Sequence, residues 1–321
     1  MRGLVARTSF WLTSTLLATG TVSAQDYPQK PIRIYTSAAG GAVDTIARLV
    51  SQGIAPPLGQ AVVVDNRGGS GVIPGELTAK APPDGYTLAM QTGTLWLSQL
   101  FEDKLPYDTF KDFTPIMLVA HSPSILVVNA SLPVKSVKEL IALAKARPGD
   151  LNYAKISTGA PNHLGAELFN AMARVRIVAI SYRGTPMAVA DLVSGQVHVM
   201  WATIQTAGPH VASGRLRALA VTSAEPSPLV PGLPTVAAGG LPGYVIQANY
   251  AFVAPARTPD AIIARLHQET ARVLRTPAAR EKLAAIGADP VVSTPAELTA
   301  IMKSELATMG RIAKETGAVA R

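Results

Sequence analysis

The residues of this sequence that could do chemistry are small or carry a hydroxyl group, and they gather in four short segments. Each segment lies at an expected strand-to-helix turn, where the first N–H groups of a helix lack backbone partners. Such N–H groups and the positive end of the helix dipole can hold an anion. None of the four contains the lysine of a nucleotide phosphate site, so a carboxylate is the favoured anion. The segments are Ser37-Ala38-Ala39-Gly40-Gly41, Gly68 to Gly75 with Gly71-Val72-Ile73 inside it, Thr92-Gly93-Thr94, and Ser157-Thr158-Gly159-Ala160-Pro161-Asn162-His163.

Four residues in or beside these segments have more specific expected roles. Gly40 and Gly41 lack a Cβ atom, which lets the backbone approach an anion closely. Asp44 falls in the first turn of the next helix, where we expect it to cap the helix and orient the loop more than to touch the ligand. Of the five histidines, His163 is the one placed to contact a ligand. The histidines lack metal-ligand spacing, so no metal site is expected.

The sequence lacks the motifs of the common enzyme classes. It contains no G-x-S-x-G, H-E-x-x-H or G-x-x-x-x-G-K-[ST] motif. The nearest approach to the dinucleotide motif G-x-G-x-x-G is Gly69-Ser70-Gly71, which meets Pro74 where the third glycine should fall. We therefore expect a protein that is not an enzyme, with no catalytic residue and no cofactor.

Composition argues against several other classes of protein. The chain has 321 residues, 48% hydrophobic and 16% charged, which is enough apolar material for two medium-sized lobes. It has no cysteine, which rules out disulfides and thiol chemistry. The net charge of +8 is spread along the chain and aromatic residues make up 5%, so nucleic-acid binding is not expected.

The N-terminus has the layout of a secretory signal peptide. Arg2 and Arg7 form a basic start, and Phe10 to Leu17 form an apolar stretch. Val22-Ser23-Ala24 then supplies a small-x-small cleavage pattern. The apolar stretch is shorter than the ~20 residues that a membrane-spanning helix needs. We expect cleavage after Ala24 and a mature protein in the periplasm.

The rest of the chain alternates between strand and helix patterns. The apolar segment Ile32 to Thr36 indicates a buried strand. Apolar residues then recur at helical spacing from Ile46 to Ile54, and Pro56-Pro57 and Gly59 are expected to stop this helix. With the next strand at Ala61 to Val64, this βαβ order predicts a parallel sheet buried on both faces. Further strands are expected at Tyr86 to Met90, Ile125 to Val128, Ile177 to Tyr182, Val197 to Trp201 and Leu216 to Val221, and capped helix starts at Ser136, Thr258, Thr276 and Thr294.

Many short stretches together form a specific pattern. They include Tyr27-Pro28-x-Lys30-Pro31-Ile32-Arg33, Gly40-Gly41-x-x-Asp44-x-x-Ala47-Arg48, Asn66-Arg67-x-Gly69, Pro83-Asp84-Gly85-Tyr86-Thr87-Leu88, His163-Leu164-x-x-Glu167-Leu168-Phe169, Tyr182-Arg183-Gly184 and Leu241-Pro242-Gly243-Tyr244. With this pattern, the chain from about Tyr27 to its C-terminus resembles the periplasmic receptors of tripartite tricarboxylate transporters, the Bug-type solute-binding proteins.

The resemblance implies an α/β protein with a type II-like periplasmic binding protein fold. Two doubly wound sheets would be joined by two crossing strands and would close on a ligand. After a signal peptide at residues 1–24, the first lobe would comprise residues 25–120 and 250–321. The second lobe would comprise residues 121–249.

The resemblance also implies where the ligand binds. One carboxylate would lie against Ser37 to Gly41 and Gly71 to Ile73, and the other end of the ligand against Ser157 to His163. Trp201 occupies the position of an aromatic residue that lines the pocket. The expected site is completed by Thr92, Thr94, Tyr182 and Ala202.

Two departures from the family pattern bear on the ligand. Family members usually carry phenylalanine and prolines where this chain has Ser37-Ala38-Ala39, and many carry aspartate where it has Ala202. Without that carboxylate the pocket lacks a partner for an ammonium group, so we do not expect an amino acid. A bulkier organic acid, including an aromatic one, would fit the wider and neutral wall.

The resemblance implies partners as well. A receptor of this family would capture a small mono-, di- or tricarboxylate and deliver it to the membrane subunits of a tripartite tricarboxylate-type transporter. The departures add an aromatic acid to the expected ligands, and a monomer is the general expectation for a receptor of this kind. Two alternatives stay open from the residues alone. One is a secreted α/β enzyme acting on an organic acid, which would need a nucleophile–base pair. The other is a ligand-loaded partner of a membrane sensor kinase.

Overall fold

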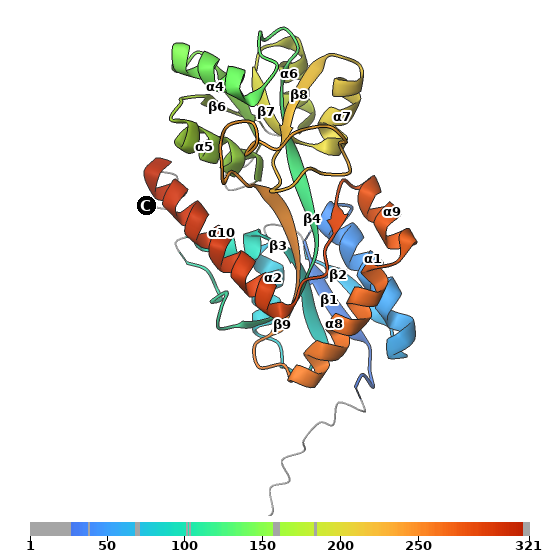
Figure 1. Ribbon diagram of the computed structural model, residues 1–321. Helices are drawn as coiled ribbons and strands as arrows, with labels where there is room; N and C mark the ends of the chain where they lie inside the picture. The colour runs from blue at the N-terminus through green and yellow to red at the C-terminus, as the bar shows by residue number, and fades with distance from the viewer. Residues whose placement is uncertain are drawn as a thin grey trace, which may run out of the picture.

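The structure is a computed structural model that describes residues 27–37, 39–67, 71–100, 102, 104–156, 161–182 and 185–316. It forms two α/β lobes, one above the other in Figure 1, with two long strands running between them. The expected two-lobed periplasmic binding protein fold is therefore confirmed. In none of the described segments is a helix both long and apolar enough to cross a membrane.

The lower lobe is built mainly from the two ends of the described chain. Its first part contains β1 (Ile32–Thr36), α1 (Ala42–Leu58), β2 (Val62–Asn66), α2 (Val72–Ala79), β3 (Thr87–Thr92), α3 (Thr94–Leu97) and a 3₁₀ turn, η2 (Ser98–Leu100). Its second part contains α8 (Asp260–Leu274), α9 (Pro277–Ala285), β10 (Asp289–Pro290) and α10 (Pro295–Thr316).

The upper lobe is built from the middle of the chain. Its elements are α4 (Val137–Ala146), β5 (Asn152–Lys155), α5 (Pro161–Ala173), β6 (Val178–Ser181), α6 (Thr185–Ser194), β7 (Val199–Thr203), α7 (Ile204–Ala212) and β8 (Leu216–Val221). In both lobes a helix follows each parallel strand, so helix N-termini gather at the carboxyl ends of the strands.

Two strands, β4 (Phe113–Asn129) and β9 (Gln247–Pro255), connect the lobes. β4 pairs with β9 as far as Pro123, then with β7 from Ser124 and with β8 from Ile125. The sheet order is β2-β1-β3-β9-β4-β7-β5-β6, and β10 and β8 also pair with β4. The change of partner within β4 marks the passage between lobes, and the expected boundaries at residues 121 and 249 stay a prediction.

β4 is much longer than the strand expected at Ile125 to Val128. Its lower-lobe half contains Pro115 and Pro123, and its pairing with β9 shifts register between Pro115 and Met117. Proline has no N–H to donate to a neighbouring strand, so its presence argues against a strand in the sequence, although a bulge can accommodate it in the structure. The strand predicted from the sequence was therefore too short.

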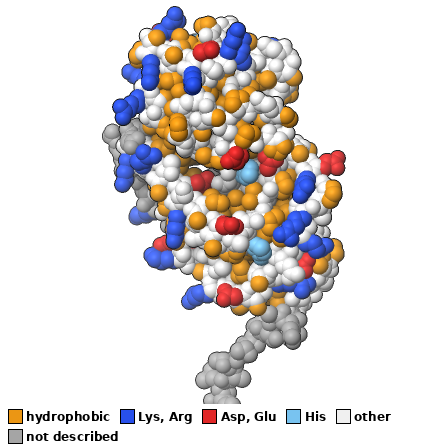
Figure 2. Space-filling model, in the orientation of Figure 1, with side chains coloured by type: hydrophobic (Ala, Val, Ile, Leu, Met, Phe, Trp, Pro, Cys, Tyr) orange, Lys and Arg blue, Asp and Glu red, His pale blue; other side chains and the backbone are white. Residues whose placement is uncertain are grey.

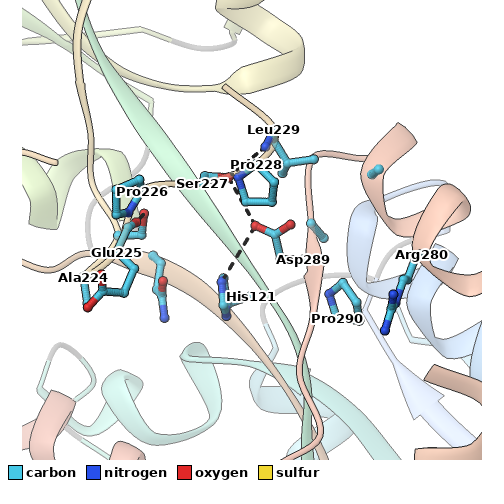
Figure 3. A pocket seen from close by; sticks show the side chains of 14 residues that line it. His121, Ala224, Glu225, Pro226, Ser227, Pro228, Leu229, Arg280, Asp289 and Pro290 are labelled. Atoms are coloured by element: carbon cyan, nitrogen blue, oxygen red, sulfur yellow. Dashed lines mark hydrogen bonds and ion pairs between the residues drawn. The ribbon is translucent and has the colours of Figure 1, made fainter. Parts of the chain in front are cut away.

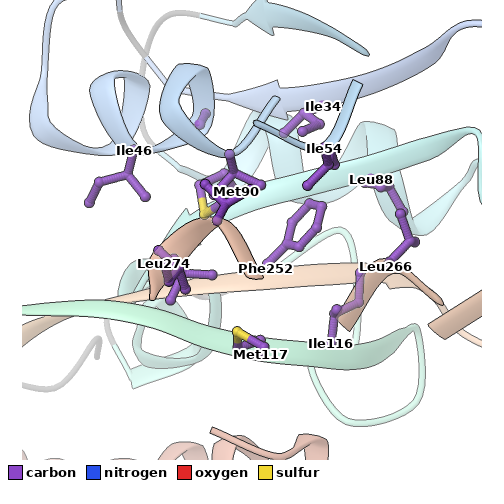
Figure 4. Close-up of a cluster of buried hydrophobic side chains, with 14 of the residues drawn as sticks. Ile34, Ile46, Ile54, Leu88, Met90, Ile116, Met117, Phe252, Leu266 and Leu274 are labelled. Carbon is purple, nitrogen blue, oxygen red and sulfur yellow. The ribbon is translucent and has the colours of Figure 1, made fainter. Parts of the chain in front are cut away.

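The helical spacing in α1 produces the core of the lower lobe. Ile46, Val50 and Ile54 are fully buried against β1 and β3, and they meet Phe252 of β9 and Leu266 of α8 in one cluster (Figure 4). The upper lobe has a separate core that contains aromatic side chains packed edge to face. Each lobe thus has its own core, as two lobes that move about crossing strands require.

The last helix packs into both lobes. Leu298 and Met302, in the first half of α10, pack into the lower lobe. Met309 and Ile312, in the second half, pack into the main core of the upper lobe. In Figure 1 α10 runs along one side of the molecule and ends beside α5. α10 therefore contacts the two lobes at once.

The expected helix starts at Ser136, Thr276 and Thr294 are confirmed. Each hydroxyl accepts a hydrogen bond from the backbone N–H three residues later, at 3.2 Å in all three cases. The start expected at Thr258 is wrong, because its hydroxyl donates to the Pro255 carbonyl at 2.8 Å and Pro259 takes the cap position.

The stop expected at Pro56-Pro57 is also wrong, since α1 continues through both prolines to Leu58. A proline at residue 57 leaves the Gly53 carbonyl without its helical donor. Arg272 of α8 donates to that carbonyl at 3.3 Å, which satisfies it. The helix then ends at Gly59, whose φ of 66° allows the left-handed cap.

Candidate functional site

Helix N-termini from the upper lobe surround a cavity of about 260 Å³ on the crossing strands. We call it the interlobe cavity. α5, α6 and α7 reach it with Asn162, Thr185 and Thr206, residues of their first turns. β4 and β9 supply Ser122, Ser124, Ala248 and Tyr250. A cavity lined by hydroxyls and the positive ends of helices suits a small anion.

On the lower lobe, Asp44 holds the loop that leads into α1. Its Oδ2 accepts from the Gly40 N–H at 2.9 Å, and its Oδ1 accepts from the Asn66 amide at 2.9 Å. Arg48 pairs with the same carboxylate at 3.0 Å. Burial alone would raise the pKa of Asp44, but the bonds from Gly40, Asn66 and Arg48 outweigh it and lower the pKa. Asp44 thus orients the loop, as expected.

The two glycines of that loop differ in conformation. Gly40 has φ of 81°, in the left-handed region that favours glycine. Gly41, the N-cap of α1, is extended, with φ of −83° and ψ of 171°, and no side chain caps the helix. Both glycines bring backbone N–H groups to the start of a 17-residue helix. The Asn66 amide also donates to the carbonyl of Ser37, which ties the loop to β2.

The second and third segments lie together. A Cβ atom built on Gly71 would collide with the Thr94 hydroxyl and lie 3.1 Å from Gln91 Oε1. The Thr92 and Thr94 hydroxyls are 2.9 Å apart. Thr92 is the last residue of β3 and Thr94 the first of α3, so the expected loop at 92–94 is reduced to Gly93. Beyond Gly71, Val72 is half-buried and Ile73 is 44% exposed at the start of α2.

Trp201 and Ala202 both border the interlobe cavity. The Trp201 indole donates to the Tyr244 hydroxyl at 2.7 Å, and that hydroxyl donates to the Gly165 carbonyl at 2.9 Å. With its N–H occupied and its side chain 1% exposed, Trp201 shapes the wall of the cavity. Ala202 is 2% exposed and packs in an apolar cluster, so the wall beside it is neutral.

His163 and Tyr182 are held by the upper lobe. His163 lies in the first turn of α5 and is 6% exposed, and burial lowers its pKa. The Tyr182 hydroxyl donates to Asp191 of α6 at 2.8 Å. Ligand contacts by both residues stay predictions. Ala38, Ser157, Thr158 and Gly159 of the expected site lie outside the described residues.

Sequence reasoning missed several residues around the interlobe cavity. Ser122 and Ser124 belong to β4, a strand whose sequence signal is interrupted by proline. Tyr250 lies on the other crossing strand, β9, and pairs with Ala120, which is 130 residues earlier in the sequence. Thr203 could have been found, because a threonine directly after an apolar strand is a common helix cap. Its hydroxyl accepts from the Thr206 N–H at 3.2 Å.

A second cavity of about 480 Å³ lies between α10, the crossing strand β9 and the loop at 92–94. We call it the α10 cavity. Ala248 lines both this cavity and the interlobe cavity. Glu305 of α10 lines it, and burial raises the pKa of this carboxyl to about 7 despite hydrogen bonds from Trp96 and Asn249.

A third cavity, of about 730 Å³, lies beside β10 and is shown in Figure 3. His121, Asp289 and Ser227 meet there, with Ser227 donating to Asp289 at 3.2 Å and His121 3.9 Å from the same carboxylate. Figure 2 shows acidic and histidine side chains at the level where the lobes meet, and Lys and Arg spread over the visible face. No helix described here begins at this cavity, so it lacks the anion-binding geometry of the interlobe cavity.

The part of the chain that the structure describes holds no group of three or more His, Asp or Glu residues arranged for a metal ion. The fold and the cleft define a two-lobed solute-binding receptor. A model of the tripartite tricarboxylate transporter family receptor matches residues 46–318. The chain belongs to this receptor family, so the expected resemblance is confirmed.

Relatives support this membership. The chain is 37% identical to a protein encoded in the tcbD–tcbE intergenic region of Pseudomonas sp. strain P51, covering 87% of this chain and 84% of that protein. It is 36% identical to BugT of Bordetella pertussis, covering 92% of each.

Two solved structures of similar proteins contain carboxylates. Rpa4515 of R. palustris with adipate is 35% identical, with a TM-score of 0.75 over 91% of this chain and 99% of that one. MatC of Rhodopseudomonas palustris with bound malate is 30% identical, with a TM-score of 0.71 over 89% and 99% of the two chains.

Proposed function

We propose that this protein is a periplasmic receptor that captures a small organic carboxylate between its lobes, as a monomer and without catalysis. The ligand class is a di- or tricarboxylate or an aromatic acid. Closure would bring the α1 and α2 N-termini of the lower lobe toward α5, α6 and α7, and would remove water from around the anion. The membrane subunits of a tripartite tricarboxylate-type transporter would receive the ligand.

One observation carries this proposal. The helix N-termini of the upper lobe converge on a cavity lined by Ser122, Ser124, Thr185 and Thr206, with no Lys or Arg among its described lining residues. Hydroxyls, backbone N–H groups and helix dipoles can hold a carboxylate without a cationic side chain. The adipate and malate found in two relatives support the ligand class. We also infer that the protein is exported and that its signal peptide is cleaved after Ala24. Residues 1–26 lie outside the described part of the chain.

The test is Gly41→Asp compared with Gly41→Asn. Both side chains are favourable helix caps and the extended backbone at Gly41 admits them, so both variants should fold. The aspartate places a negative charge where the ligand carboxylate is expected. Thermal-shift measurements against mono-, di- and tricarboxylates should show stabilisation of the wild-type protein, because binding to the native state stabilises it by mass action.

We expect the shift to disappear in Gly41→Asp and to persist, weaker, in Gly41→Asn. Equal shifts in both variants would place the ligand elsewhere. No shift with any acid, for wild-type protein shown to be folded and ligand-free, would overturn the proposed function.

A further inference from the structure

The wall that α10 contributes to the α10 cavity is one face of the helix. Ile301, Ser304, Glu305, Thr308 and Met309 line it, at the spacing that puts residues on one side of a helix. The cavity volume of about 480 Å³ lies within the range typical of small-molecule sites. Ala248 lines both this cavity and the interlobe cavity, so the two cavities are neighbours along β9. The lining also includes Thr92, Gly93 and Thr94, a segment expected to bind the ligand.

Glu305 is the one ionisable side chain among the described residues that line this cavity. Its Oε2 accepts from the Trp96 indole at 2.7 Å, and its Oε1 accepts from the Asn249 amide at 2.6 Å. A Cβ atom built on Gly93 would lie 3.8 Å from Oε2. The carboxylate therefore lies next to the loop expected to bind the ligand.

The charge on Glu305 has no cationic side chain to balance it in the cavity. The described lining contains neither Lys nor Arg, and both observed hydrogen-bond donors are neutral. Each carboxylate oxygen has a second lone pair, so each can accept one more hydrogen bond. A negatively charged group brought into the same cavity would meet a like charge away from bulk water, which is unfavourable.

We propose that the α10 cavity receives the end of the bound acid opposite its carboxylate, and that Glu305 selects acids whose second end donates a hydrogen bond over acids with a second carboxylate. This inference rests on the proposed function, because it requires carboxylate capture between the lobes. The apolar side chains Leu97, Leu164 and Met309 would contact the carbon frame of such an acid. Among the proposed ligands, this disfavours di- and tricarboxylates and favours an aromatic or other organic acid that has one carboxylate and a hydroxyl group at its opposite end.

The experiment is isothermal titration calorimetry at pH 8 with two pairs of acids that share a carbon frame. The pairs are 4-(hydroxymethyl)benzoate with terephthalate, and 6-hydroxyhexanoate with adipate. Burial raises the pKa of Glu305 to about 7, so most Glu305 side chains are ionised at this pH. In at least one pair the wild-type protein should bind the hydroxy acid about tenfold or more tightly, since like-charge contacts are costly.

Glu305→Gln should remove most of that preference. The substitution preserves the shape of the side chain: its oxygen can accept from Trp96, and its amide can donate to Asn249 after the Asn249 amide turns over. Glu297→Gln is the matched control, because it removes a carboxylate from the exposed start of the same helix. The control should keep the wild-type preference.

The possible results separate the inference about Glu305 from the proposed function. A wild-type protein that binds the dicarboxylates as tightly as the hydroxy acids overturns the inference and leaves the proposed function standing. The same holds if Glu305→Gln keeps the preference. If no acid of either kind binds folded wild-type protein, the proposed function falls and the inference falls with it.

Discussion

At the scale of the residue, the site depends on side chains that hold backbone in place. Asp44 bonds to the Gly40 N–H and to Asn66. Trp201 gives its N–H to Tyr244 and borders the cavity with its ring packed in the core of the upper lobe. Because these polar groups are occupied within the protein, we expect the ligand to be held by other backbone N–H groups and hydroxyls of the cavity. Fixed dipoles of this kind bind an anion without reorganising.

Asp44→Asn tests the role of that carboxylate. The amide cannot accept all three of the bonds from Gly40, Asn66 and Arg48, so the loop should loosen. We expect a loss of about 1–3 kcal/mol in the free energy of unfolding, the usual cost of leaving buried partners unsatisfied. Carboxylate binding should weaken as well. Chemical denaturation and calorimetry measure the two effects.

The same variant has an expected pH dependence. The folded pKa of Asp44 lies below its unfolded value, so its stabilising effect is complete above the unfolded pKa of about 3.9 and is lost as the pH falls through the folded pKa. The difference in unfolding free energy between wild type and Asp44→Asn should therefore shrink toward low pH. Asp65→Asn, which removes partners of Arg33 and Arg67 outside the loop, is the control. A difference that grows toward low pH would contradict the assignment.

At the scale of the element, α10 links the lobes while it lines a cavity. Its first half packs in the lower lobe and its second half in the upper lobe. The face with Glu305 points into the α10 cavity, and the Trp96 and Asn249 bonds fix α10 to α3 and to a crossing strand. A change of angle between the lobes must therefore be accommodated along this helix.

Met309→Ala tests the upper attachment of α10. Met309 is 3% exposed in the core of the upper lobe, so truncation should cost about 2–5 kcal/mol, as for other buried large-to-small changes. Met187→Ala on α6 makes the same change at a side chain that is 61% exposed, and it should stay within about 0.5 kcal/mol. Thermal unfolding of the two variants side by side measures the contrast. Equal losses would mean that the end of α10 is not part of that core.

At the scale of the whole molecule, the two lobes are joined by β4 and β9, and α10 packs against both. Two strands crossing between separate cores permit a hinge motion, and a ligand that contacts both lobes shifts the population toward the closed form. The interlobe cavity draws its lining from the upper lobe and the crossing strands, while the α10 cavity also includes Thr92 and Thr94 of the lower lobe.

Small-angle X-ray scattering tests the closure. The radius of gyration of the ligand-free wild-type protein should fall when a stabilising acid is added at saturation, because the lobes approach each other. Gly41→Asp should show no such decrease with the same acid, since its added charge opposes binding. A radius that is unchanged when calorimetry shows the wild-type site occupied would contradict closure.

The sequence by itself indicated the α/β class and the four segments of small residues, and its motifs indicated the receptor family through their resemblance to known members. The α/β class and the segments follow from local features: strand and helix periods, caps, and glycines that leave backbone N–H groups free. Asp44 could be assigned to its loop because its distance from Gly40 is set by the first turn of a helix. Interactions within a few residues can be read from sequence because the helix fixes their geometry.

Only the tertiary structure decided which distant residues meet. It placed Tyr250 and Ser122 together at the interlobe cavity, and it brought Glu305 to Trp96 across 209 residues of sequence. The crossing strand β4 was concealed because prolines interrupt it and both of its faces are buried, which removes the alternation that marks a strand. Long-range contacts of this kind depend on how the lobes pack around the crossing strands, and no local pattern in the chain records that packing.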